Sequence, residues 1–322
     1  MYTSFNSLCI IDMKIETRNE PKAKIKLISG DAFRIDTASY LSKLHTVCIA
    51  VAKRGSFKTT AISNLLRMYK ETGTMDRILI LSPTFHSNVK ILEQLEIKPE
   101  DIFDDIDDVS VVDRVKAICD EERDAFLRWK KMKANYERVM KQIDMGSYPL
   151  NGEYDDNLME YYDPSTNSFR MPEPRYTCYL QNRPPVIGWI LDDILGGKIC
   201  NSRSTLALTQ KHRHQSPTYD GGAVGISLFF LVQSFKSQNG LNRAIRNQAC
   251  IALIGRSKDD EEKKQIAESF AGEISPETFL KVHHEATKDS NHDFLYVDLH
   301  PKEPRMRFRK NFDQYLIVDE GN

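Results

Sequence analysis

The sequence of 322 residues predicts an α/β fold in which a mostly parallel sheet lies between two layers of helices. Short apolar runs alternate with segments of helical length, and polar or glycine-rich residues follow each run. The runs are apolar throughout, as is typical of parallel strands buried on both faces. They cover residues 47–51, 78–81, 186–191, 226–232 and 249–254. Further runs at residues 294–299 and 307–308 predict a hairpin that adds antiparallel strands to one edge.

Composition excludes several classes of protein. With 45 basic and 46 acidic residues the net charge is −1, so any nucleic-acid contact must come from a local patch. Basic residues cluster after Arg203 and near residues 302–310, where a solvated face is the plainer interpretation. The six cysteines show no C-x-x-C spacing, which favours reduced thiols in an intracellular protein. Without a long apolar run or a signal-peptide pattern, we expect no membrane association.

An insertion of unusual length separates the second and third apolar runs, at residues 101–185. Its first part repeats apolar residues at helical spacing from Val112 to Ile143, which predicts a long amphipathic helix. The acidic residues at its start, from Asp101 to Asp108, lack the pattern of a metal-binding loop, so we expect a solvated approach to that helix. From Gly146 to Pro185 the sequence has no periodicity and predicts a surface excursion.

A phosphate-binding loop is predicted directly after the first strand, where a helix follows at once. Such a loop aims backbone N–H groups and the positive helix end at an anion, while a lysine and a hydroxyl hold the outer phosphates and magnesium. Lys58 and Thr59 fit those two roles. The candidate nucleotide-binding residues are Lys53, Arg54, Gly55, Ser56, Phe57, Lys58, Thr59 and Thr60.

The loop departs from the pattern G-x-x-x-x-G-K-[ST] at two positions. Ala52 stands at the first glycine and Phe57 at the second. Because glycine there permits close approach of the backbone to phosphate, the Phe57 side chain must point away, and weak affinity or an altered loop follows. The alternative for the loop alone is an ordinary strand-to-helix turn.

Polar side chains end the third and fourth strands. Asp192 and Asp193 follow the third, where we expect Asp192 to orient Mg²⁺ and Asp193 to position or deprotonate the attacking water. Gln233 follows the fourth strand, and a phosphate-sensing role is favoured over a helix cap. A strand that merely leaves the core is the alternative for an isolated Asp-Asp pair.

In their order these features resemble the DNA-packaging ATPases of poxviruses and other large DNA viruses, members of the FtsK/HerA group of ring-forming DNA translocases. The resemblance covers residues 33–317, excluding most of residues 101–180. The matching segments are the phosphate loop, the strand that ends at Ser82-Pro83, the pair Asp192-Asp193, Arg213-His214, Gln233, and residues 242–247.

The resemblance implies a RecA-like P-loop ATPase that uses ATP and Mg²⁺ to package double-stranded DNA into a capsid. On this basis we expect a single ATPase domain over residues 1–322, with an N-terminal extension (1–45), the insertion, and a C-terminal helix and strand hairpin (256–322). It further implies a ring of five or six identical subunits that works in the virion or the host-cell cytoplasm, with capsid vertex proteins as further partners.

The resemblance also implies an arginine that acts on the nucleotide of the neighbouring subunit. Arg213 is the first candidate, followed by Arg243 and Arg246, and Arg54 is a candidate within the same chain. Candidate DNA contacts are Lys198, Arg203 and Lys236.

Two other functions stay open. One is a different P-loop DNA motor, such as a helicase. The other is a nucleotide-binding scaffold whose degenerate loop does not hydrolyse ATP.

Overall fold

The computed structural model describes residues 35, 37–85, 93–144, 162–163, 165–166, 168–169, 173–176, 183–219, 222–235 and 240–318. By its internal contacts the chain divides into Met1–Ala32 and Phe33–Asn322, and every described residue belongs to the second unit. The expected DNA contact Lys236 and most of residues 146–182 lie outside the described residues.

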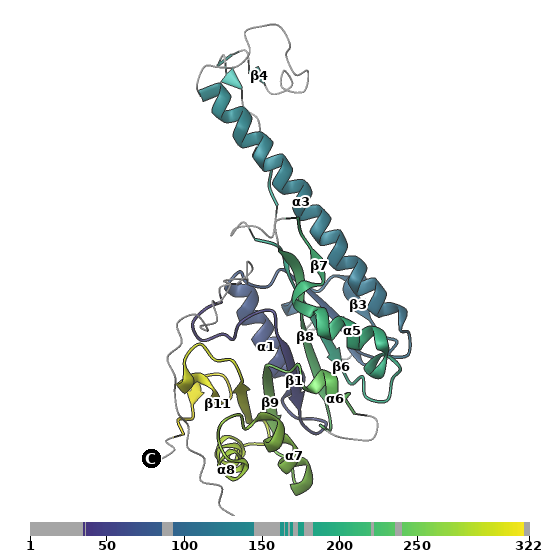
Figure 1. Ribbon diagram of the computed structural model, residues 1–322, viewed down its shortest axis with the longest axis vertical. Coiled ribbons are helices and arrows are strands. Elements are labelled where there is room, and N and C mark those ends of the chain that lie inside the picture. The colour runs from purple at the N-terminus through teal and green to yellow at the C-terminus, as the bar shows by residue number, and fades with distance from the viewer. Residues whose placement is uncertain are drawn as a thin grey trace, which may run out of the picture. The chain divides into compact units, whose positions relative to one another are not determined.

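A ten-stranded sheet forms the centre of this unit (Figure 1). Its path runs β12-β11-β10-β9-β1-β8-β6-β2-β3, and β7 pairs with β8 off this path. The strands are β1 (Val47–Val51), β2 (Arg77–Leu81), β3 (Ile102–Phe103), β6 (Val186–Asp192), β7 (Ser216–Pro217), β8 (Ala223–Val232), β9 (Ile251–Gly255), β10 (Phe294–Asp298), β11 (Phe308–Lys310) and β12 (Gln314–Tyr315). Strands β4 (Tyr162–Asp163) and β5 (Ser168–Phe169) pair separately.

The five predicted apolar runs are β1, β2, β6, β8 and β9, with ends shifted by a few residues in four of them. All five pair in parallel, whereas β10, β11 and β12 add antiparallel strands beside β9. Strand β8 separates β1 from β6, and the order β9-β1-β8-β6-β2 is that of the RecA-like P-loop fold. The predicted fold class is therefore confirmed.

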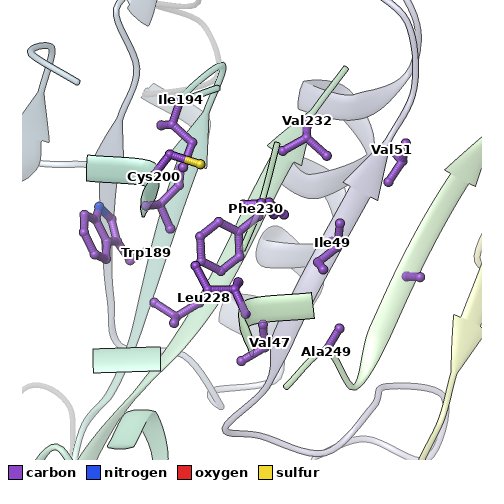
Figure 2. Close-up of a cluster of buried hydrophobic side chains, with 14 of the residues drawn as sticks. Val47, Ile49, Val51, Trp189, Ile194, Cys200, Leu228, Phe230, Val232 and Ala249 are labelled. Carbon is purple, nitrogen blue, oxygen red and sulfur yellow. The ribbon is translucent and has the colours of Figure 1, made fainter. Parts of the chain in front are cut away.

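Helices cover both faces of the sheet because its central strands are apolar on both sides. Helix α1 (Lys58–Glu71) packs on one face, with Cys48 and Ala50 of β1. On the other face Val47, Ile49 and Val51 join the apolar cluster in Figure 2. That cluster receives side chains from α3 (Ser110–Asp144), α5 (Arg203–Lys211), α6 (Arg243–Arg246), α7 (Asp260–Phe270) and α8 (Pro276–Thr287).

The predicted long helix of the insertion is α3, of 35 residues. Its first turns pack on the sheet through Val112 and Val115. Farther along, Phe126 and Trp129 form a small cluster with Tyr176, and Trp129 Nε1 donates to Pro174 O at 3.1 Å. Within the described part of the chain, α3 and the other helices lack the combination of length and apolar character needed to cross a bilayer.

The acidic run from Asp101 to Asp108 was expected to be solvated, but this expectation is wrong for Asp101, which is only 1% exposed. Arg77 at the start of β2 donates to both of its carboxylate oxygens and also to Glu122 on α3. Asp104 and Asp105 are exposed, in line with the prediction. Residues 256–318 also differ from the sequence expectation, since they contain two helices, α7 and α8, where one was predicted.

Candidate functional site

The segment between β1 and α1 leaves a helix N-terminus available to an anion. Phe57 precedes the first turn of α1 and makes no side-chain capping bond, whereas Ser202, Asn242, Asp259 and Ser275 cap α5, α6, α7 and α8. The first N–H groups of a helix lack partners within the helix and carry its positive dipole end. Gly55 adopts φ +72°, a conformation that glycine reaches without steric cost. The loop therefore has the local geometry of an anion cradle.

Lys58 begins α1 and is nearly buried, at 8% exposure. Its ammonium donates to Ala52 O at 2.6 Å and to Lys53 O at 3.0 Å, so the side chain folds back over the loop. Burial lowers the pKa of Lys58, and the nearby carboxylates of Asp192 and Asp193 oppose that shift. The lysine thus lies within electrostatic range of Asp192, which ends β6, and of Asp193, which follows it.

Phe57 points into the core and away from the loop opening, as the sequence analysis required. Its ring is 4% exposed and stacks on Phe294 of β10 with 4.5 Å between ring centroids. Gly255 at the end of β9 makes room for it, because a Cβ on this glycine would lie 2.6 Å from the Phe57 ring. The bulky residue therefore occupies space that a missing side chain on β9 provides.

Asp192 ends β6 and is 7% exposed. Burial and the adjacent charge of Asp193 raise its pKa to about 6, while the charge of Lys58 opposes the rise. A buried carboxyl with a raised pKa is a frequent property of functional sites. Two carboxylates against one lysine leave an excess of negative charge that a cation would balance.

Asp193 has φ +53°, a left-handed conformation that costs a non-glycine residue about 1 kcal/mol or more. This turn after β6 directs its carboxylate toward the end of β8, where Gln233 Nε2 donates to Asp193 Oδ1 at 2.7 Å. Strain of this kind persists only where surrounding structure enforces it. The amide and the carboxylate of two neighbouring strands therefore form one polar pair.

The donor set fits a magnesium nucleotide. Ser56 Oγ is buried in the loop without a hydrogen-bond partner, which suits a polar group that a ligand satisfies. Thr59, half-buried in the first turn of α1, offers a hydroxyl, and Asp192 offers a carboxylate oxygen. Oxygen ligands of this kind together with phosphate oxygens are what Mg²⁺ prefers.

Of the three arginines predicted to act between subunits, Arg213 lies near the amino ends of β1 and β9, whereas the Arg246 guanidinium lies 5.1 Å from the ring centroid of Phe235, which follows β8. Arg213 Nη2 lies 3.8 Å from Sγ of Cys250, whose N–H bonds Val47 O at the start of β1. Arg243 and Arg246 line a cavity of about 560 Å³ beside Ala249, just before β9. Burial and the charge of Arg243 lower the pKa of Arg246.

The remaining predicted residues are exposed. Lys53, Arg54 and Thr60 project from the loop and the first turn of α1. Lys198 and Arg203 are exposed after β6, where the Lys198 N–H bonds Asp107 of the acidic run at 2.9 Å.

Sequence reasoning missed Glu262, a buried carboxylate on α7. It accepts from Phe235 N at 3.1 Å and from Ser257 Oγ at 2.8 Å, so it joins the segment after β8 to the segment after β9. The signal was present: Asp259 caps α7 and Glu262 follows three residues later, the spacing of a capping box. Glu262 positions the chain near Gln233 instead of closing that box.

Comparison with known proteins found no family model and no curated relative that matches this sequence. Solved structures of P-loop ATPases of the FtsK/HerA type do match. A chain with ATPases 2 and 3 of EssC from Geobacillus thermodenitrificans is 13% identical with a TM-score of 0.45, and the match covers 86% of this chain and 41% of that one. The present chain thus spans about two fifths of its length.

The genome packaging NTPase B204 from Sulfolobus turreted icosahedral virus 2, solved in complex with ATP-gammaS, is 11% identical with a TM-score of 0.37. That match covers 83% of this chain and 96% of B204. The cytoplasmic domain of the type VII secretion ATPase EccC from Thermomonospora curvata is 14% identical with a TM-score of 0.38, covering 85% of this chain and 26% of that one. None of these similarities is specific to poxvirus proteins.

Proposed function

We propose that this protein binds ATP with Mg²⁺ and hydrolyses it. One observation carries the proposal: Lys58, Asp192, Asp193 and Gln233, far apart in the sequence, meet at the carboxyl edge of one parallel sheet. Ligands of open α/β sheets bind at this edge. The Lys58 ammonium and the uncapped N–H groups of α1 supply positive potential for phosphates, opposite a pair of carboxylates.

In the proposed reaction the side chains of the site bind the nucleotide, orient the attacking water and accept its proton. Lys58 exchanges its hydrogen bonds to the Ala52 and Lys53 carbonyls for hydrogen bonds to phosphate oxygens. Phosphate oxygens carry negative charge, so they are stronger acceptors than neutral carbonyl oxygens. Asp193, held by Gln233, orients the attacking water and accepts its proton. Thr59 and Asp192 would hold Mg²⁺, and the ion would supply positive charge beside the transferred phosphoryl group.

We further propose that hydrolysis drives movement of double-stranded DNA and packages a viral genome. The order of motifs in the sequence supports this, together with the position of Arg213 near the amino ends of β1 and β9, the opposite end of the strands from Lys58. An arginine so placed can serve a neighbouring copy in a ring of five or six subunits. Capsid vertex proteins would be partners, and the virion or host-cell cytoplasm the location.

The second candidate function is a nucleotide-binding scaffold that does not hydrolyse ATP. Two features of the phosphate loop favour it. Phe57 replaces a loop glycine, and Lys58 is bonded to two loop carbonyls. If those bonds persist with nucleotide bound, the lysine cannot reach the outer phosphates and hydrolysis fails.

Steady-state ATP hydrolysis with and without duplex DNA tests the proposal. We expect turnover in the parent protein that DNA stimulates, and a loss of at least a hundredfold in Lys58→Ala, since the lysine contacts the group being transferred. Lys264→Ala, an exposed lysine of α7, is the matched control and should retain turnover.

Absence of turnover in the parent with ATP still bound would favour the scaffold. ATP turnover that duplex DNA does not change would support ATP hydrolysis but contradict the proposal that the protein moves DNA. Imaging with an ATP analogue and duplex DNA then tests the ring directly.

A further inference from the structure

A second basic cavity lies beside the candidate nucleotide site, between α7 and α8. Its volume is about 590 Å³. It is lined by Arg256, Ser257, Lys258, Asp260, Lys263, Leu280, His283, His284, Thr287 and Lys288. None of these residues has a role in the proposed hydrolysis.

The lining carries an excess of positive charge. Four lysine and arginine side chains face it together with two histidines, against the single carboxylate of Asp260. Lys263 is paired with Asp260 at 2.5 Å and Lys288 with Glu285 at 2.6 Å, but the two carboxylates are 91% and 55% exposed. Exposed pairs of this kind contribute little and are readily exchanged for another anion.

Two lining residues are held rigidly and shape the cavity. Arg256 donates to the carbonyls of Thr287 and Lys288 at the end of α8, and His283 Nε2 bonds Gly255 O at 2.9 Å. Nε2 donates a hydrogen bond to this carbonyl, so Nδ1 of the neutral ring is an acceptor and His283 shapes the cavity wall without donating to a phosphate. Burial lowers the pKa of His283, and the charges of Lys263 and His284 add to that effect.

The walls favour a phosphate group over a nucleobase. A base needs apolar or aromatic surface to stack on, and Leu280 is the one large apolar side chain in the lining. Hydroxyls of Ser257 and Thr287 and several ammonium groups are suited to phosphate oxygens. Flexible lysines bind phosphates as point charges without reading sequence.

The cavity shares two lining residues with a small hollow beside the proposed site. Arg256 and Ser257 also line a small hollow with Lys53 and Gln233. The pairing of Val51 with Ile254 brings the ends of β1 and β9 side by side, so both sites open at the same edge of the sheet.

We propose that the cavity between α7 and α8 binds phosphate groups of a nucleic-acid backbone. Phosphate affinity follows from the lining alone, whereas the nucleic-acid source rests on the proposed DNA motor. Lys258 and Lys288 of the lining contact the phosphates, with Lys288 exchanging its exposed pair with Glu285, and Arg256 and Ser257 connect them to the segment beside Gln233.

Binding of a fluorescent short DNA duplex without nucleotide tests the proposal. We expect the double variant Lys258→Glu, Lys288→Glu to bind at least tenfold more weakly, with a salt dependence of log affinity reduced by about 2. The control Lys264→Glu, Lys281→Glu makes the same charge change on exposed lysines of the same two helices outside the cavity. Both variants should unfold at the parent's urea midpoint.

Equal weakening in both double variants would overturn the proposal, because the effect would then be one of net charge. Inorganic pyrophosphate that binds the parent, loses affinity in the first variant only and is not displaced by duplex supports a phosphate site but overturns the nucleic-acid source. Lys58→Ala should bind duplex as the parent does. If the parent binds duplex at this cavity and hydrolyses no ATP, the proposed function fails while the inference stands.

Discussion

Phe57 shows how one residue can break a sequence pattern without breaking the loop around it. Its ring fills a space bounded by Gly255, Ala52 and Phe294, on the far side of the backbone from the loop opening. Burial of a phenylalanine stabilises a fold by a few kcal/mol. The side chain is therefore an anchor for the loop.

Replacing Phe57 with a small residue should destabilise the fold. We expect Phe57→Ala to lower the free energy of unfolding by about 3–5 kcal/mol, because it leaves a cavity in the core. Urea denaturation followed by circular dichroism measures the change. Tyr219→Ala is the control, since this tyrosine is 98% exposed. An unchanged midpoint in Phe57→Ala would show that the ring is not packed as described.

Asp193 separates stability from chemistry at a single position. Because its φ of +53° suits glycine, Asp193→Gly should change the free energy of unfolding by no more than about 1 kcal/mol. The same change removes the carboxylate bonded to Gln233 and should abolish ATP turnover. Paired unfolding and hydrolysis assays check both parts. Full turnover in Asp193→Gly would remove this residue from the proposed reaction.

At the scale of elements, a partly buried ion network fastens α3 to the sheet. Arg77 of β2 is bonded to Asp101 before β3 and to Glu122 on α3, and Tyr176 also donates to Glu122 at 2.9 Å. The insertion is thus attached to the strand that precedes it.

Breaking this network should be costly. Asp101→Ala removes the buried partner of Arg77, which keeps its bond to Glu122, so we expect the free energy of unfolding to fall by about 1–3 kcal/mol. Asp104→Ala, in the same acidic run but exposed, should change it by less than about 0.5 kcal/mol. Chemical denaturation of the two variants separates the buried part of the run from the solvated part. Equal effects would contradict the burial of Asp101.

At the scale of the whole molecule, buried histidines link stability to pH. Burial lowers the pKa of His45 to about 3, and the charges of His212, Arg183 and Arg213 add to the shift. Burial also lowers the pKa values of His212 and His283. These histidines stay neutral in the folded state. In the unfolded chain they take up protons once the pH falls below the ordinary histidine pKa of about 6.5. Stability is therefore lost as pH falls through that value.

Urea unfolding at about pH 7.5 and about pH 5.5 measures this linkage, and His45 alone should contribute a loss of about 1 kcal/mol at the lower pH. His45→Gln should remove that part of the loss, whereas His284→Gln, an exposed histidine, should not. Asp192 acts in the opposite direction: its pKa is raised to about 6, so its stabilising contribution at low pH is lost as pH rises through that value. A loss that His45→Gln leaves unchanged would contradict the burial of this imidazole.

The sequence by itself determined the periodic elements and the chemical identity of the candidate site. Continuous apolar runs specify strands buried on both faces, and the residues that directly follow them must lie at strand ends. Hence Lys58, Asp192 and Gln233 could be located at the sheet edge from local pattern alone. The long helix α3 followed in the same way from its apolar spacing.

Tertiary structure alone decided which distant residues meet. Neither the space that Gly255 leaves for Phe57 nor the burial of Asp101 by Arg77 has a local signature, since each depends on strand order and register. The bond from Gln233 to Asp193 and the basic cavity between α7 and α8 arise likewise from elements that packing brings together. Periodicity predicts which face of an element is buried. Only the folded chain shows which residues pack against that face.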